Sequence, residues 1–260
     1  MAFFSGNIFS HALRMQTALC AIIPNDLLCR PAKGFPTVYL LHGMSDNSSC
    51  WTRFTSVERY AVEHGLAVIM PEAQRSFYTD MRMGLRYFTY ISDELPKLAA
   101  KMFGLSPSRE DTFVAGLSMG GYGALKCLFA RPETFCAGAS LSGAVDMSEV
   151  IAGDPPDGGM HIEEPAIFGD PPRLTPDEDL FRLADKAAAL PENIRPRVMT
   201  CCGVDDTKTY DMNQRFRRHI EKSRLDYHYG EGPGGHDWRF WDEWIDKSFD
   251  FFLEGRKPKV

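Results

Sequence analysis

Residues 112–123 read TFVAGLSMGGYG, an apolar run followed directly by the pattern G-x-S-x-G and by two further glycines. The apolar run is typical of a strand, and residues 124–130 predict a helix that ends at Arg131-Pro132. A strand, a sharp turn and a helix in this order hold Ser118 in a strained backbone conformation, with its hydroxyl above the sheet edge. Gly116 and Gly120 let neighbouring chain pass without a Cβ clash. The plainer alternative is a glycine-rich turn with an idle serine.

Strands and helices are expected to alternate on both sides of this motif. The expected strands are 4–10, 13–23, 37–41, 66–70, 112–115, 136–141, 197–202 and 225–229, and the expected helices are 51–63, 85–103, 124–130, 210–223 and 238–253. This order predicts an α/β fold with a mostly parallel central sheet and helices on both faces. Residues 145–195 are rich in Pro, Gly and Asp and show no second core. We therefore expect one domain over 1–260, with 145–195 as a lid-like insertion over the active site.

Composition narrows the classes of partner. The chain has 260 residues and a formal net charge of -6, which argues against nucleic acid and anionic membrane as partners. No stretch has the length of a membrane span, and residues 1–6 do not read as a signal peptide. The seven cysteines form no C-x-x-C pair, and no H-x-x-H is present. These features predict reduced thiols in a cytoplasmic protein, with no metal and no cofactor; a homo-oligomer is one option.

A nucleophilic serine needs a base and an acid that orients the base. Of the four histidines after Ser118, His236 follows GEGPGG in a loop between the last expected strand and the last helix. That position puts His236 at the same sheet edge as Ser118, although a solvated loop histidine is the alternative. His161 falls in the insertion. His219 lies in an expected helix and His228 in an expected strand, so we interpret both as structural. The acid is expected after strand 197–202, where Asp205 and Asp206 are both candidates.

The tetrahedral intermediate of acyl transfer carries an oxyanion that needs two backbone donors. One is expected to be the N–H of Met119, the residue after the nucleophile. The other is expected in the loop after strand 37–41, where the N–H of Met44 is our candidate. An ordinary tight turn at His42-Gly43 is the alternative. His42 precedes the serine and belongs to the oxyanion loop, so we interpret it as structural.

With these motifs in place, the chain resembles the esterase D family of α/β-hydrolases, and within it the bacterial tributyrin esterase and short-chain acetyl esterase group. The stretches that carry the resemblance include 38–45 (VYLLHGMS), 115–123 (AGLSMGGYG), Cys202-Gly203 and His236-Asp237-Trp238. In this family the acid is the last residue of Gly-x-x-Asp, which implies Asp206, and the oxyanion donors map onto the amides of Met44 and Met119. The chain departs from the family at Thr207-Lys208, where an aromatic or apolar residue is usual.

The resemblance implies hydrolysis of short-chain acyl esters through an acyl-enzyme, with Ser118, His236 and Asp206 as the triad and a small-molecule ester as substrate. Trp51, Tyr78 and Trp238 are candidates for the pocket wall, with core packing as the equal alternative. Other readings within enzymes are an acetyl-xylan or feruloyl esterase, an S-formylglutathione hydrolase, or acyl transfer to an acceptor other than water. A catalytically inactive hydrolase fold that serves as a binding module is the alternative from another class.

Overall fold

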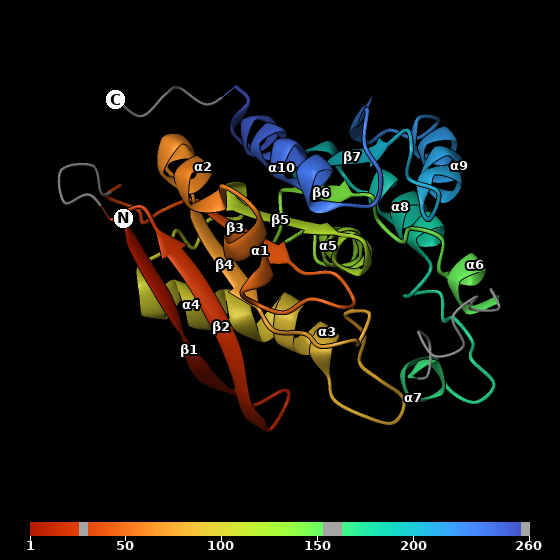
Figure 1. Ribbon diagram of the computed structural model, residues 1–260, viewed down its shortest axis with the longest axis horizontal. Helices are drawn as coiled ribbons and strands as arrows, with labels where there is room; N and C mark the ends of the chain where they lie inside the picture. Colours follow the sequence, from red (N-terminus) through yellow and green to blue (C-terminus); the bar gives the residue numbers. More distant parts are fainter. Residues whose placement is uncertain (26–30, 153–162, 256–260) are drawn as a thin grey trace.

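The computed structural model describes residues 1–25, 31–152 and 163–255 of the chain (Figure 1). The described strands form one eight-stranded sheet in the order β1-β2-β4-β3-β5-β6-β7-β8. Their bounds are β1 (Ala2–Ser10), β2 (Met15–Ile23), β3 (Thr37–Leu41), β4 (Ala67–Pro71), β5 (Thr112–Leu117), β6 (Ala137–Leu141), β7 (Arg197–Gly203) and β8 (Asp226–Gly232). The pairs β1·β2 and β2·β4 are antiparallel, and the remaining pairs are parallel. The predicted fold class is therefore confirmed.

Helices cover both faces of the sheet (Figure 1). Their bounds are α1 (Cys50–Phe54), α2 (Val57–His64), α3 (Tyr87–Thr89), α4 (Leu95–Phe103), α5 (Met119–Ala130), α6 (Met147–Ala152), α7 (Glu164–Phe168), α8 (Leu180–Ala188), α9 (Tyr210–Ile220) and α10 (Trp238–Leu253). The core has two halves, because side chains alternate across a strand. One half packs α4, α5, α8 and α9 against the sheet, and the other packs α1, α2 and α10.

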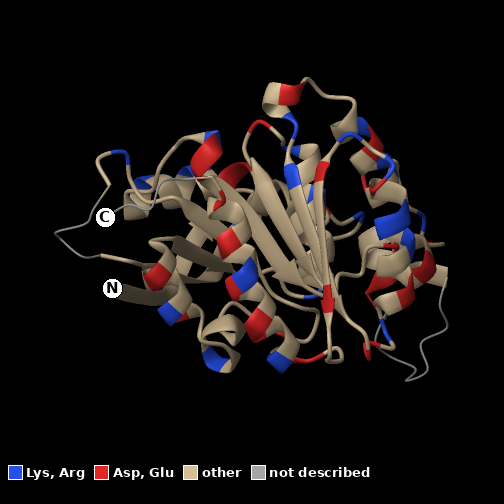
Figure 2. Cartoon of the chain, turned by 90° about the horizontal axis from the view of Figure 1, so that it is seen from above, with Lys and Arg blue, Asp and Glu red and all other residues tan. Residues whose placement is uncertain are grey.

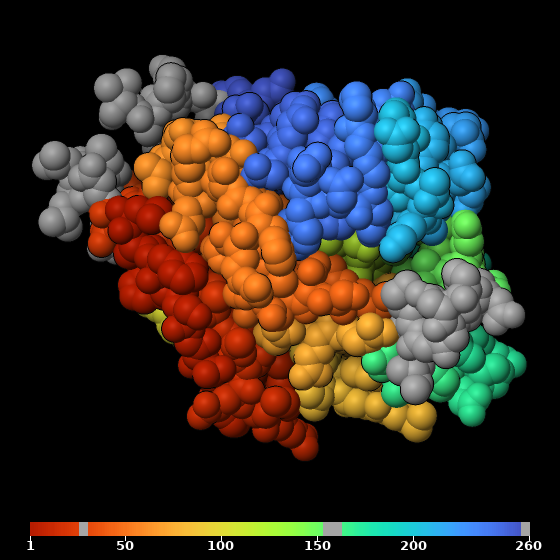
Figure 3. Space-filling model, in the orientation of Figure 1, coloured from red at the N-terminus to blue at the C-terminus, as the bar shows by residue number. Residues whose placement is uncertain are grey.

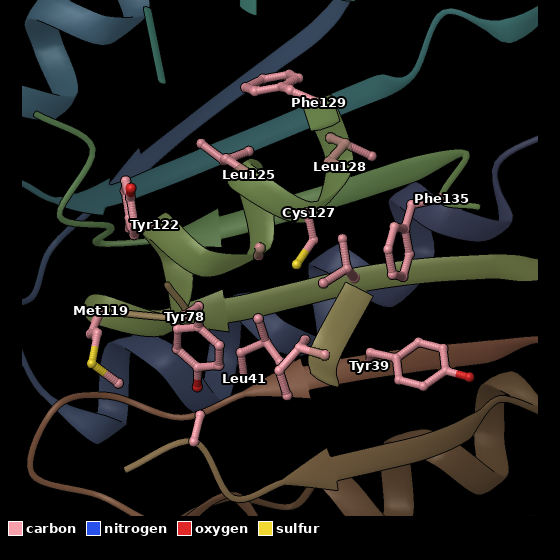
Figure 4. Packing of buried hydrophobic residues seen from close by; sticks show 14 of the residues in the cluster. Tyr39, Leu41, Tyr78, Met119, Tyr122, Leu125, Cys127, Leu128, Phe129 and Phe135 are labelled. Carbon is pink, nitrogen blue, oxygen red and sulfur yellow. The ribbon is translucent and has the colours of Figure 1, made fainter. Parts of the chain in front are cut away.

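The helix α5 directly follows the nucleophile of the G-x-S-x-G motif and is almost wholly buried. Every residue from Met119 to Phe129 is buried. Figure 4 shows side chains of α5, among them Leu125 and Cys127, in one buried layer with Tyr39 of β3. A Cβ at Gly123 would collide with the ring of Tyr78. The glycines therefore let α5 approach its neighbours closely, which fixes the start of the helix relative to the sheet.

Two expected helices are interrupted in the structure, while the helix expected over 124–130 begins earlier, at Met119, and the one expected over 210–223 ends at Ile220. The helix expected over 51–63 is divided into α1 and α2, because Thr55 is extended and the Ser56 amide donates to Asp242 of α10 at 2.8 Å. The helix expected over 85–103 contains a π-helical turn, Tyr90–Glu94, directly before Leu95-Pro96. Proline has no N–H for the regular helical hydrogen bond, which is consistent with irregular backbone at that point.

The described parts of 145–195 form α6, α7 and α8. Residues 153–162, which include His161 and the first Pro-Gly cluster, lie outside the described residues. Helix α8 buries Leu180, Leu183, Ala184 and Ala187 within the core half that contains α5. Part of the expected insertion therefore belongs to the helical layer of the fold.

The surface charges are mixed. Figure 2 shows Lys and Arg interspersed with Asp and Glu on the helices around the sheet. Across the described ranges, no helix is both long enough and apolar enough to cross a membrane. In the same part of the chain, no group of three or more His, Cys, Asp or Glu residues is arranged to hold a metal ion.

Candidate active site

Ser118 occupies a sharp turn between β5 and α5. Its backbone has φ +53° and ψ −119°, and its N–H donates to the carbonyl of Leu141 at 3.0 Å. A positive φ is strained for a residue with a Cβ, so the turn must be held by its surroundings. A Cβ at Gly116 would collide with the backbone of Gly120, and one at Gly120 would collide with the carbonyl of Leu41. The motif thus needs both glycines to bring β3, β5 and α5 together.

The loop after β8 carries His236 to this turn. The imidazole Nε2 lies 2.9 Å from the hydroxyl oxygen of Ser118, and Nδ1 lies 2.8 Å from Oδ2 of Asp206. Trp241, from the first turn of α10, contacts the imidazole edge to face, with ring centroids 5.0 Å apart. The structure therefore brings together Ser118, His236 and Asp206, from segments far apart in the sequence.

Asp206 is buried and fully bonded. Besides His236, its carboxylate accepts hydrogen bonds from the Thr209 hydroxyl at 2.8 Å and from the backbone N–H groups of Lys208 and Thr209, each at 3.0 Å. Burial opposes the charged form, but the hydrogen bond and charge of His236 and the Thr209 bonds outweigh it and lower the pKa of Asp206 to about 2. Asp205 is exposed, and its carboxylate accepts a 3.4 Å hydrogen bond from the Gly234 amide.

The loop after β3 lies beside the serine turn. The Gly43 amide donates to Asp46 at 3.2 Å, and a Cβ at Gly43 would collide with Leu117. Met119 is the first residue of α5, so its N–H is one of the unpaired amides at a helix N-terminus. Neither this amide nor that of Met44 donates a backbone hydrogen bond to any residue that the structure describes.

His42 is buried in the loop after β3. Its Nδ1 lies 2.7 Å from the carbonyl oxygen of Gly43, and its Nε2 accepts from the Ala73 amide at 3.0 Å. Both ring nitrogens are therefore engaged within the fold. Of the other histidines after Ser118, His219 pairs with Asp185 and His228 with Asp226, and His161 lies outside the described residues.

The three aromatic candidates for the pocket wall have different surroundings. Trp51 and Tyr78 have no exposed surface. Trp51 donates its indole N–H to the Leu41 carbonyl at 3.1 Å, and the Tyr78 hydroxyl donates to the His42 carbonyl at 2.9 Å. Both side chains brace the loop after β3 from within, so neither lines an open cavity here. Only Trp238 is partly exposed.

Trp238 joins the loop after β3 to the start of α10. Its ring lies edge to face on both Trp51 and Trp241, with centroids 5.3 Å apart in each pair. Figure 3 shows the orange segment after β3 and the blue start of α10 side by side. The sequence reasoning missed Trp241 and Thr209 as neighbours of the triad. The three-residue spacing Trp238–Trp241 places both side chains on one face of α10. Thr209 follows Asp206 in a turn, where its N–H and hydroxyl both donate to the Asp206 carboxylate.

Comparisons with known proteins show the family of the chain. A family model described as "Putative esterase" matches residues 10–251. An acetyl esterase of Caldicellulosiruptor saccharolyticus is 31% identical, over 96% of this chain and 98% of its own length. Two solved structures from Staphylococcus aureus are each 32% identical and cover 97% of this chain. One is fluorophosphonate-binding serine hydrolase F with substrate bound, with a TM-score of 0.86 over 98% of its chain. The other is the S-formylglutathione hydrolase FrmB, with a TM-score of 0.83 over 99% of its chain.

Proposed function

The chain belongs to this esterase family, with an α/β-hydrolase fold, and is a carboxylic ester hydrolase; we propose that it works as a serine esterase through Ser118, His236 and Asp206. The observation that supports this triad most strongly is the unbroken chain of hydrogen bonds from the Ser118 hydroxyl through the imidazole to a buried carboxylate. A serine alone is a weak nucleophile, and this arrangement is the one that activates it.

In the proposed mechanism Ser118 attacks the acyl carbonyl while Nε2 of His236 accepts its proton. The imidazolium then donates this proton to the leaving alcohol, which departs and leaves an acyl-enzyme. Water repeats the sequence and releases the carboxylic acid. Asp206 stays charged throughout, because its donors stabilise the carboxylate, and it orients the imidazole by accepting from Nδ1.

The oxyanion of each tetrahedral intermediate is proposed to lie between the N–H groups of Met44 and Met119. The supporting observation is that both amides are free of backbone acceptors in the described chain, at the two loops that meet at Ser118. Donors fixed in advance stabilise developing charge at little reorganisation cost, by about 3–4 kcal/mol for one donor in a serine hydrolase.

Short-chain acyl esters are the substrate class that we propose first. An acetyl esterase is similar to the chain over nearly the whole length of both proteins. S-formylglutathione hydrolysis is the second candidate, supported by the likeness to the FrmB structure. Both reactions use the same acyl-enzyme chemistry, and they differ in the leaving group, an alcohol or a thiol.

The same enzyme is proposed to act on small molecules in a reducing compartment such as the cytoplasm. The supporting observation is that the six cysteines within the described ranges are all free, five of them buried. Disulfides would be expected to form between suitably placed cysteines in an oxidising compartment. The 145–195 segment is proposed to border the substrate pocket as part of a single domain over 1–260.

A substrate panel tests the proposed function. Hydrolysis of p-nitrophenyl esters from acetate to decanoate, a feruloyl ester and S-formylglutathione is measured for the wild type and for Ser118→Ala. We expect the highest kcat/KM between acetate and butyrate, and loss of that activity in Ser118→Ala. A preference for S-formylglutathione would favour the second candidate, and a preference for the feruloyl ester would move the substrate to plant cell-wall esters. Full activity in Ser118→Ala would exclude the proposed mechanism.

A further inference from the structure

A cavity that none of the triad residues lines lies between the C-terminal half of α5, α8 and the segment 79–88. Its volume is about 630 Å³, within the range of small-molecule sites. Its wall contains four cationic and four anionic side chains beside apolar ones. Thr79, Arg82, Phe88, Lys126, Phe129 and Leu183 are among the wall residues. The cavity is therefore a separate feature of the fold.

Lys126 brings a buried ammonium group to this cavity. The residue is 3% exposed, and its Nζ donates to the Thr79 hydroxyl at 2.8 Å. The ammonium also lies 5.1 Å from the ring centre of Phe88 and 5.5 Å from that of Tyr122. No carboxylate of a described residue forms an ion pair with it. An ammonium has three donors, so two remain without a hydrogen-bonded oxygen among these contacts.

The other cations of the wall are each paired with a carboxylate, and Asp80, also in the wall, lies 3.6 Å from Arg86. Glu178 is 3% exposed and accepts from Arg82 at 2.8 Å, and from the amide and hydroxyl of Thr175 at 2.7 and 2.9 Å. Arg131 and Lys186 each pair with an aspartate. Burial lowers the pKa of Lys126 to about 8, against the opposing charge of Glu178. The cationic and anionic side chains of the wall are equal in number, but Lys126 forms no direct ion pair with any described carboxylate. A buried ammonium without close acceptors is costly.

We propose that this cavity is a second ligand site, which binds a small organic carboxylate with an apolar tail. The carboxylate pairs with the Lys126 ammonium through a charge-assisted hydrogen bond, and the tail lies against Phe88, Phe129 and Leu183. One carboxylate supplies acceptors for the two donors of Lys126 that lack a hydrogen-bonded oxygen. The apolar wall beside Lys126 favours an organic acid over an inorganic anion, because phosphate has no apolar part that could contact this wall.

Isothermal titration calorimetry of the full chain tests the site with two probes, hexanoate and inorganic phosphate. Lys126→Met removes the charge at nearly constant volume, and Lys222→Met is the matched control, since Lys222 is an exposed lysine outside the cavity. We expect hexanoate to bind the wild type and Lys222→Met equally, and Lys126→Met at least tenfold more weakly. Binding is measured directly, so the result does not depend on the proposed esterase activity.

Ala130→Phe provides a second variant that keeps Lys126 and fills the cavity from a partly exposed wall position. It should weaken hexanoate binding at least tenfold as well, which covers the case in which Lys126→Met does not fold. Equal affinity of hexanoate for the wild type and for either cavity variant would overturn the proposal, because binding would then be elsewhere, including at the triad. Absence of hexanoate binding, or Lys126-dependent binding of phosphate alone, would also overturn the carboxylate assignment.

Discussion

At the scale of single residues, the adjacent aspartates Asp205 and Asp206 have opposite surroundings. Asp206 is buried among donors and contacts His236, whereas Asp205 is exposed in the same turn. We expect Asp206→Asn to reduce kcat/KM for p-nitrophenyl acetate on the order of 10³–10⁴-fold, because an amide orients the wrong imidazole tautomer and cannot stabilise the imidazolium. Asp205→Asn is the matched control and should change the rate by less than about threefold, since a neutral surface substitution has little effect. A larger loss from Asp205→Asn would move the acid by one residue.

The turn at Ser118 depends on Gly116 because there is no space for a Cβ at that position. In Gly116→Ala the new methyl group would overlap the backbone of Gly120 and lie 2.9 Å from the Cβ of Leu41. We expect the free energy of unfolding to fall by about 1–3 kcal/mol or more, together with loss of esterase activity. Gly6→Ala on β1 is the control, because a Cβ there has nothing within 4 Å. The unfolding midpoints of both variants are measured by urea unfolding followed by circular dichroism. Equal midpoints for Gly116→Ala and Gly6→Ala would show that the turn can relax.

At the scale of elements, the start of α10 joins helix capping to the position of the base. Asp237 follows His236 and accepts from the amides of Arg239 and Phe240 at 3.0 and 3.3 Å. Asp237→Ala should lower the free energy of unfolding by about 0.5–2 kcal/mol, since it removes this cap. It should also lower kcat more than it raises KM, because the imidazole is then less well held. Asp237→Ser, which retains a cap, should restore most of both; an activity loss that Ser does not rescue would separate the two effects.

Elements could be predicted from sequence where the local pattern and the packing agree. The strand 37–41 and the helix 238–253 match the structure to the residue, because each has an uninterrupted apolar pattern. The division at Thr55-Ser56 could not be predicted, since it depends on a bond from the Ser56 amide to Asp242, 186 residues away. Such a contact leaves no local signal in the chain.

At the scale of the whole molecule, parallel strands explain why the site could be assembled from its sequence order. Segments that follow β5, β7 and β8 must meet at one sheet edge, and they carry Ser118, Asp206 and His236. The choice between the two aspartates required the family resemblance, because both follow the same strand. The aromatic residues could not be placed either: core and pocket wall have the same composition, and only the packing of Trp51 and Tyr78 shows that they lie inside.

Stability of the whole molecule in acid provides the last prediction. The pKa of Asp206 in the folded chain is about 2, and the hydrogen bond from Arg131 lowers the pKa of Asp93. Because an aspartate in the unfolded chain has a pKa of about 3.9, these groups stabilise the fold above that pH. Their contribution is lost as the pH falls through the folded-state values. We therefore expect the urea midpoint of the wild type to decrease between about pH 4 and pH 2. Asp206→Asn should show a shallower decrease than Asp205→Asn, which keeps the buried carboxylate, so parallel curves for the two variants would contradict the assignment of the lowered pKa to Asp206.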